Sequence, residues 1–208
     1  MEQFSKREAI TVASDFAKKN IKFFIPLFIL ILIISFSFDY LLKTLGKDNV
    51  VVGLILSILR TVIFTIFSLG MIKISLKILD NEEIKIVDIF SQYHLFIRYF
   101  LASIIRNLIV FVGFIFFIVP GVIFAIRFGF FDFLIVDKNM RIIESLKKSW
   151  YITKGNTLNL FLFYILLFLI NVLGFFAFIV GLFFSVPLTI IAEAFVYRKL
   201  AKGLELIK

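Results

Sequence analysis

The chain has 208 residues, of which 62% are hydrophobic, with a mean hydropathy of +1.07 and a formal net charge of +9. This composition excludes a soluble globular domain, which would expose more apolar surface than water tolerates. The chain has no cysteine and one histidine, which excludes thiol nucleophiles, thiolate metal sites and disulfides. We therefore expect an all-α integral membrane protein, with residues 1–208 forming one domain.

Six apolar segments are long enough to cross the roughly 30 Å hydrocarbon core of a bilayer as helices that rise about 1.5 Å per residue. They cover residues 22–42, 50–74, 97–118, 121–137, 157–173 and 175–197. Pro120 and Gly121 form a tight apolar turn between the third and fourth segments, and Asn171 and Gly174 mark a turn between the fifth and sixth. The pattern predicts six transmembrane helices arranged as three hairpins.

Three polar stretches flank these segments and have an amphipathic pattern. They cover residues 1–21, 84–96 and 139–152. Apolar residues fall on one helical face and charged residues on the other, which is typical of helices that lie in the headgroup region of a membrane. We predict an amphipathic N-terminal segment and two interfacial helices on the cytoplasmic face. The alternative is that they are connectors tucked under the helix bundle.

Lysine and arginine are distributed unevenly between the two sides of this arrangement. One side holds only Lys43 and Lys47, whereas the other holds the basic residues of both termini and of the remaining loops. Cytoplasmic loops carry an excess of these residues, so the basic side is predicted to be cytoplasmic. We expect a multi-pass protein of the cytoplasmic (plasma) membrane with both termini cytoplasmic. The net charge then belongs to this face rather than to nucleic-acid binding.

Four ionisable residues within the predicted spans form a candidate midplane polar cluster, namely Arg60, Arg106, Arg127 and Asp132. An arginine at the centre of a transmembrane helix costs about 2.5–3.5 kcal/mol, so such residues normally face the protein interior or a wet cavity. Counting along the helices places Arg60, Arg106 and Asp132 at one depth. Arg127 falls in the outer third, and Glu193 close to the cytoplasmic interface.

Three interpretations of the midplane cluster remain open. The first is a buried ion-pair layer, in which Arg106 and Asp132 meet because a short turn joins their helices. The second is a polar site for an anionic or zwitterionic ligand, such as a lipid headgroup or a small anion. The third is that the arginines snorkel or bind backbone carbonyls.

A second candidate site lies in and just after the 139–152 stretch. Its candidate contacts with lipid headgroups are Arg141, Lys147, Lys148, Trp150 and Lys154. A cation close to an anionic membrane surface contributes about 1 kcal/mol of binding. The expected partners are membrane lipids with anionic headgroups, with another membrane protein or a second copy of the chain as alternatives.

The half of the chain from Pro120 onward resembles a type of bacterial and archaeal multi-pass protein. The resemblance is carried by Pro120-Gly121, Asp137 at the end of a span, residues 144–150 and 153–156, and Pro187 through Tyr197-Arg198. These residues are similar to a signature of the YciC-like families and of the membrane domain that accompanies some glycerophosphodiester phosphodiesterases. The resemblance implies a six-helix domain of undefined activity. The catalytic domain of the fused relatives has no counterpart here, so hydrolysis does not carry over.

The sequence also lacks a phosphate loop, an HExxH pair and a serine elbow. We therefore expect no enzymatic activity, no metal and no cofactor. The patterns favour a protein that binds lipid or a membrane partner, in envelope organisation or as an accessory membrane subunit. The alternative is a transporter or channel-like protein that moves a lipid headgroup or a small anion past the midplane arginines.

Overall fold

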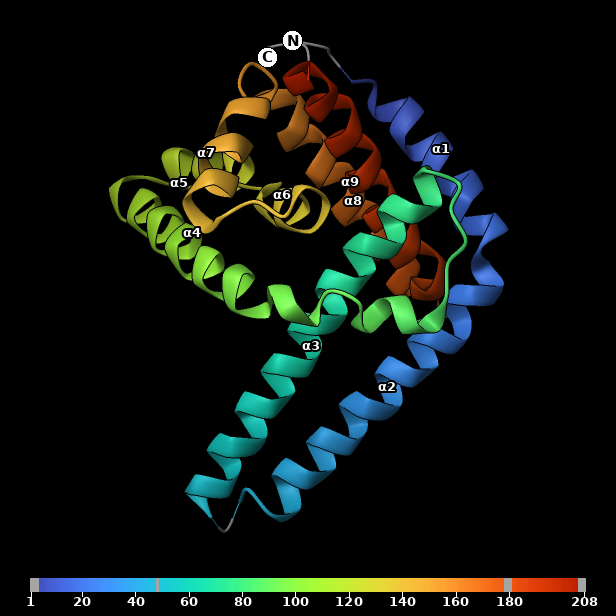
Figure 1. Cartoon of the computed structure of the whole chain (residues 1–208), viewed down its shortest axis with the longest axis vertical. Helices are drawn as coiled ribbons and strands as arrows, with labels where there is room; N and C mark the ends of the chain where they lie inside the picture. The colour runs from blue at the N-terminus through green and yellow to red at the C-terminus, as the bar shows by residue number, and fades with distance from the viewer. Residues whose placement is uncertain (1–3, 48, 178–180, 206–208) are drawn as a thin grey trace.

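A computed structural model of the protein describes residues 4–47, 49–177 and 181–205. Within these ranges the chain is helical and has no β-strand (Figure 1). The elements in chain order are α1 (Lys6–Lys19), α2 (Ile21–Thr44), α3 (Val50–Leu79), the 3-10 helices η1 (Ile86–Phe90) and η2 (Tyr93–Leu95), α4 (Phe96–Phe116), α5 (Ile118–Arg127), α6 (Phe131–Lys138), α7 (Ile142–Ile152), α8 (Thr157–Phe176) and α9 (Leu182–Glu205).

Five helical segments of the described chain are long and apolar enough to cross a membrane. They are Ile21–Thr44, Val50–Leu79, Ile86–Phe116, Ile118–Lys138 and Thr157–Phe176. An all-helical protein with several such segments is thereby confirmed, and the fold fits a membrane protein. The predicted sixth span at 175–197 is not among the five, and its residues 178–180 lie outside the described ranges.

Helices α2 and α3 form a long hairpin that projects from the rest of the molecule (Figure 1). Asn49 begins α3 by accepting hydrogen bonds from the backbone N–H groups of Val51 and Val52, which satisfies donors that have no partner within the helix. Apolar side chains such as Phe36 and Ile58 are exposed on the hairpin. A surface of this kind needs cover from lipid or protein.

The core lies where the second half of α3 meets α6 and α9. Leu69 of α3, Leu134 of α6 and Ile191 of α9 are completely buried there. Tyr197 of α9 is also buried and stacks on Phe133 of α6, with 5.3 Å between the ring centroids. The helices that hold this core are therefore α3, α6 and α9, and α1 covers one side of it.

Helix α1 packs along α9 through a row of small residues (Figure 1). Ala9, Ala13 and Ala17 recur every four residues, which places them on one helical face, and all three are completely buried. Glu8 and Lys199 form an ion pair of 3.1 Å across the same contact. The N-terminal segment is helical, as predicted, and its small-residue face lies against protein.

An ion-pair cluster joins the C-terminal ends of α3 and α6 to the second half of α9. Arg198 donates to Asp80 at 2.6 Å and to Asp137 at 3.1 Å, and the Tyr197 hydroxyl donates to Asp137 at 2.8 Å. Asp137, Tyr197 and Arg198 are among the residues that carry the resemblance described above. The structure gives them a shared role in fastening three helices together.

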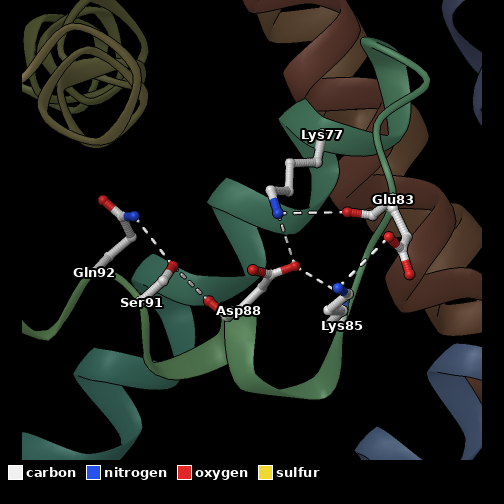
Figure 2. A network of polar contacts seen from close by, with 6 residues as sticks. All are labelled: Lys77, Glu83, Lys85, Asp88, Ser91 and Gln92. Carbon is white, nitrogen blue, oxygen red and sulfur yellow. Dashed lines mark hydrogen bonds and ion pairs between the residues drawn. The ribbon is translucent and has the colours of Figure 1, made fainter.

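The predicted interfacial helix at 84–96 is wrong as a single helix, because the stretch forms η1 and η2. The Asp88 carboxylate accepts hydrogen bonds from Lys77 Nζ at 2.9 Å and from the backbone N–H of Lys85 at 2.8 Å (Figure 2). Ser91 Oγ donates to the carbonyl of Asp88 at 2.7 Å. Such local side-chain bonds compete with the regular bonds of an α-helix and tie the segment to α3.

The predicted fourth span at 121–137 falls within Ile118–Lys138, one of the five span-like segments, but the segment is not one unbroken helix. Helix α5 ends at Arg127 and α6 begins at Phe131, so the chain turns through Phe128–Phe130. The preceding turn lies at Phe117, and Pro120 falls in the first turn of α5, where proline is tolerated because its missing N–H has no partner within the helix.

The fifth apolar segment ends later than expected. Helix α8 continues to Phe176, past both Asn171 and Gly174. Gly174 instead allows a close approach, because a Cβ there would lie 2.4 Å from Ser185 Oγ of α9. The small residue therefore serves helix packing.

Candidate functional site

Two hydroxyl groups of α7 and its C-terminal end form hydrogen bonds with the backbone at the break between α5 and α6. Ser149 Oγ donates to the carbonyl of Arg127 at 2.9 Å and accepts from the N–H of Phe130 at 3.1 Å. Thr153 Oγ1 donates to the same carbonyl at 3.2 Å. These bonds satisfy backbone groups that a continuous helix would have satisfied internally. The break and the orientation of α7 therefore depend on each other.

Arg127 and Trp150 reinforce this contact. The guanidinium carbon lies 4.2 Å from the centroid of the Trp150 ring, and Arg127 also donates to the Trp150 carbonyl at 3.0 Å. The indole packs on Phe124 and Phe128 of the preceding helix and turn. Trp150 is thus half-buried and packs on the break between α5 and α6. Arg127 therefore lies against α7.

The opposite face of α7 borders a groove of about 1130 Å³ at the beginning of α4. Its basic residues are His94, Arg98, Arg141, Lys147 and Lys148, its acid is Glu144, and its apolar wall includes Ile97, Leu101, Ile143 and Tyr151. Four permanent cations thus face one carboxylate. We call this the α4–α7 groove.

Arg98 is held in place at the edge of the α4–α7 groove. It donates to the backbone carbonyl of Asn139 at 2.8 Å and also to the side-chain oxygen of Asn139. Asn139 ends α6 in the left-handed conformation (φ 52°), which asparagine adopts more readily than most residues. The end of α6 thereby positions a guanidinium that comes from a distant part of the chain.

The other three cations of the groove are available to a ligand. Within the described residues Arg141, Lys147 and Lys148 form no ion pair. Lys148 lies 6.0 Å from the centre of the Tyr151 ring. The groove therefore offers concentrated positive charge beside apolar side chains, which suits an anionic group attached to a hydrocarbon chain.

Three of the five residues predicted to contact headgroups lie together in the groove, and two do not. Arg141, Lys147 and Lys148 line it, whereas Trp150 packs on the other side of α7 and Lys154 follows the helix as an exposed residue. Sequence reasoning did not bring His94 of η2 or Arg98, Ile97 and Leu101 of α4 to this site, because they join α7 only through tertiary structure. A signal was present in Arg98, a cation at the very start of a predicted span.

The residues of the midplane cluster are dispersed. Arg60 pairs with Asp39 of α2 at 2.8 Å. Arg106 donates to the carbonyl of Ala125 at 3.3 Å, and the Asp132 carboxylate accepts from the N–H of Phe133 at 2.9 Å. The predicted ion pair between Arg106 and Asp132 is not formed. Depth was counted along an unbroken fourth helix, and the turn at Phe128–Phe130 invalidates that count.

These features define the class of the protein, which is an all-helical protein with several membrane-span-like helices and a basic, apolar-walled groove. The chain belongs to the family described as Domain of unknown function (DUF7847), whose model matches residues 85–203. The matched region runs from η1 to α9 and contains the whole α4–α7 groove. The comparisons with curated proteins and with solved structures give no match.

Proposed function

We propose that the α4–α7 groove binds the headgroup of an anionic phospholipid and that the protein acts in the membrane as a lipid-binding or partner-binding component. The proposal rests on one observation. Arg141, Lys147 and Lys148 line the same groove without ion pairs among the described residues, and Asn139 holds Arg98 at its edge. The guanidinium group matches the geometry of phosphate oxygens, and the lysine ammonium group binds phosphate as a compact point charge.

The apolar wall supports a lipid rather than a soluble anion. Ile97 and Ile143 are 69% and 51% exposed on the groove, and Leu101 continues the wall along α4. An acyl chain that lies along this wall removes apolar surface from water at about 25 cal/mol per Å². Headgroup and chain would thus be recognised by adjacent surfaces.

The wider role follows from the same binding. We propose an accessory or envelope-organising protein of the cytoplasmic membrane, without enzymatic activity, with the groove facing the anionic cytoplasmic leaflet and both termini on that side. The relation to the YciC-like families and to the membrane domain of the phosphodiesterases is part of this proposal. Its support is that Asp137, Tyr197 and Arg198, which carry the resemblance, contact one another in this chain.

The test is lipid binding by the full chain in phosphatidylcholine nanodiscs, with phosphatidylglycerol as the titrated probe. The Arg141→Gln, Lys147→Gln, Lys148→Gln triple variant removes three cations worth about 1 kcal/mol each, so affinity should fall about 100-fold. Raising the salt concentration should weaken binding by the wild type.

A matched control removes the same charge elsewhere. Lys18, Lys19 and Lys22 are exposed and lie at the junction of α1 and α2, away from the groove. The Lys18→Gln, Lys19→Gln, Lys22→Gln variant should bind phosphatidylglycerol like the wild type. Equal losses in both triple variants would show that net charge, and not the groove, attracts the lipid.

The transporter alternative receives less support from the geometry. Arg60 lines a cavity of about 340 Å³ with residues of α3 and with Tyr99, whereas Arg106 lines a different cavity of about 400 Å³. A path along both arginines would need one continuous cavity. We therefore favour binding over transport.

A further inference from the structure

The cavity beside Arg106 has a composition of its own. It lies between α4, α5, α8 and α9 and has a volume of about 400 Å³, which is within the range of small-molecule sites. Its walls are mainly apolar and include Phe114, Ile126 and Phe161. Three polar side chains, Arg106, Tyr164 and Glu193, converge on it from three different helices.

Arg106 keeps unused donor capacity at this cavity. Its terminal nitrogens donate to the carbonyl of Ala125 at 3.3 Å and to Asn107 Oδ1 at 3.2 Å. Its Nε is buried and has no hydrogen-bond partner. A buried N–H without a partner costs about 1–3 kcal/mol, which a ligand acceptor would recover.

Glu193 and Tyr164 are also without partners among the described residues. The Glu193 carboxylate forms no ion pair and no hydrogen bond there, although Asp132 lies near enough to add a second negative charge to its surroundings. The Tyr164 hydroxyl makes no hydrogen bond in this part of the chain and lies against Gly129, where a Cβ would be 2.7 Å away. The glycine thus makes room for the hydroxyl.

The separation of Arg106 and Glu193 is the informative feature. Opposite charges in a low-dielectric interior attract strongly and normally pair. These two line one cavity yet approach no closer than the 4 Å limit of an ion pair. The space between them is therefore suited to a ligand that carries both charges.

We propose that this cavity binds a small zwitterion, whose acidic group contacts Arg106 and Tyr164 and whose ammonium group contacts Glu193. A simple anion would meet the field of Glu193 and Asp132, and a simple cation would leave the Arg106 Nε unpaired. The shared chemistry is an acidic group a few bonds from a primary ammonium. It occurs in free aminoalkyl phosphates and in the headgroup of phosphatidylethanolamine.

The experiment uses the full chain in phosphatidylcholine nanodiscs and three probes, O-phosphoethanolamine, inorganic phosphate and ethanolamine. Calorimetric titration should give at least tenfold tighter binding of O-phosphoethanolamine than of either fragment. Glu193→Gln, which keeps the shape of the side chain, should lose at least tenfold for the zwitterion and none for phosphate. Arg106→Lys should retain part of the binding that Arg106→Gln loses.

Three further measurements keep the result interpretable. Arg141→Gln, in the α4–α7 groove, should leave O-phosphoethanolamine binding unchanged, so this proposal and the groove proposal can fail separately. Thermal unfolding of each variant identifies those that do not fold. Competition by phosphatidylethanolamine placed in the nanodisc assigns the site to a lipid headgroup, and its absence assigns the site to a free zwitterion. Equal affinity for phosphate and O-phosphoethanolamine, or no effect of Glu193→Gln, would overturn the proposal.

Discussion

The α2–α3 hairpin and the region from η1 to α9 each contain an arginine within an apolar segment, and they provide partners for its charge in different ways. In the hairpin, Arg60 is neutralised by Asp39 of the neighbouring helix, a contact that needs only two adjacent helices. In the other region, Arg127 depends on a helix break, a tryptophan ring and a carbonyl of α7. The first solution is local, whereas the second requires the whole tertiary structure.

The largest expected loss of stability concerns the contact between the second half of α3 and η1. A Cβ at Gly70 would lie 2.0 Å from the carbonyl oxygen of Ile89, and backbone atoms cannot easily move away. We expect Gly70→Ala to lower the free energy of unfolding by about 3 kcal/mol through overpacking. Chemical unfolding in one detergent, followed by circular dichroism, measures this.

The matched control for Gly70 lies in the hairpin half of the same helix. A Cβ at Gly53 would lie 3.1 Å from the carbonyl oxygen of Gly46, a tight but less severe contact. Gly53→Ala also gains helix propensity, so its net effect should stay within about 1 kcal/mol. Equal stability of the two variants would show that η1 is not held firmly against α3.

A middle-sized effect is expected where α7 satisfies the helix break. Ser149→Ala removes the acceptor of the Phe130 N–H, whereas the Arg127 carbonyl keeps the hydroxyl of Thr153. The variant should cost about 2 kcal/mol and increase hydrogen exchange at Phe130. Ser57→Ala in the hairpin removes only a bond to the carbonyl of its own helix and should change stability by less than about 0.5 kcal/mol. If Ser149→Ala is equally mild, water replaces the hydroxyl and the break does not depend on α7.

The smallest effect concerns the ion pair of the hairpin. The side chains of Arg60 and Asp39 are 37% and 43% exposed, so their coupling energy should be about 1 kcal/mol or less. A double-mutant cycle with Arg60→Leu and Asp39→Leu measures it, and a cycle that combines Arg60→Leu with Lys43→Leu should be additive. Additivity in the first cycle as well would mean that this pair does not form in the membrane.

The difference between the two regions also explains which helices and site residues could be predicted from the sequence. Hydropathy and length identified the hairpin helices, because a membrane span is a local property of about 20 residues. The same reasoning treated 121–137 as one unbroken helix, since nothing in its apolar pattern reveals that Ser149 and Thr153 will bind backbone groups at a break. Likewise Arg141, Lys147 and Lys148 were recognised from their spacing on a helix. Arg98 was not assigned to this site, because its position depends on hydrogen bonds to Asn139, which is 41 residues away in the sequence.

The position of Trp150 has a spectroscopic consequence. It is the only tryptophan of the chain, so all indole emission originates from one point in the fold. That point lies on the back of the helix whose front lines the α4–α7 groove, under the guanidinium of Arg127. Any movement of α7 relative to the break between α5 and α6 changes the distance between a fluorophore and a nearby cation. The unlabelled protein therefore contains its own optical probe of the groove.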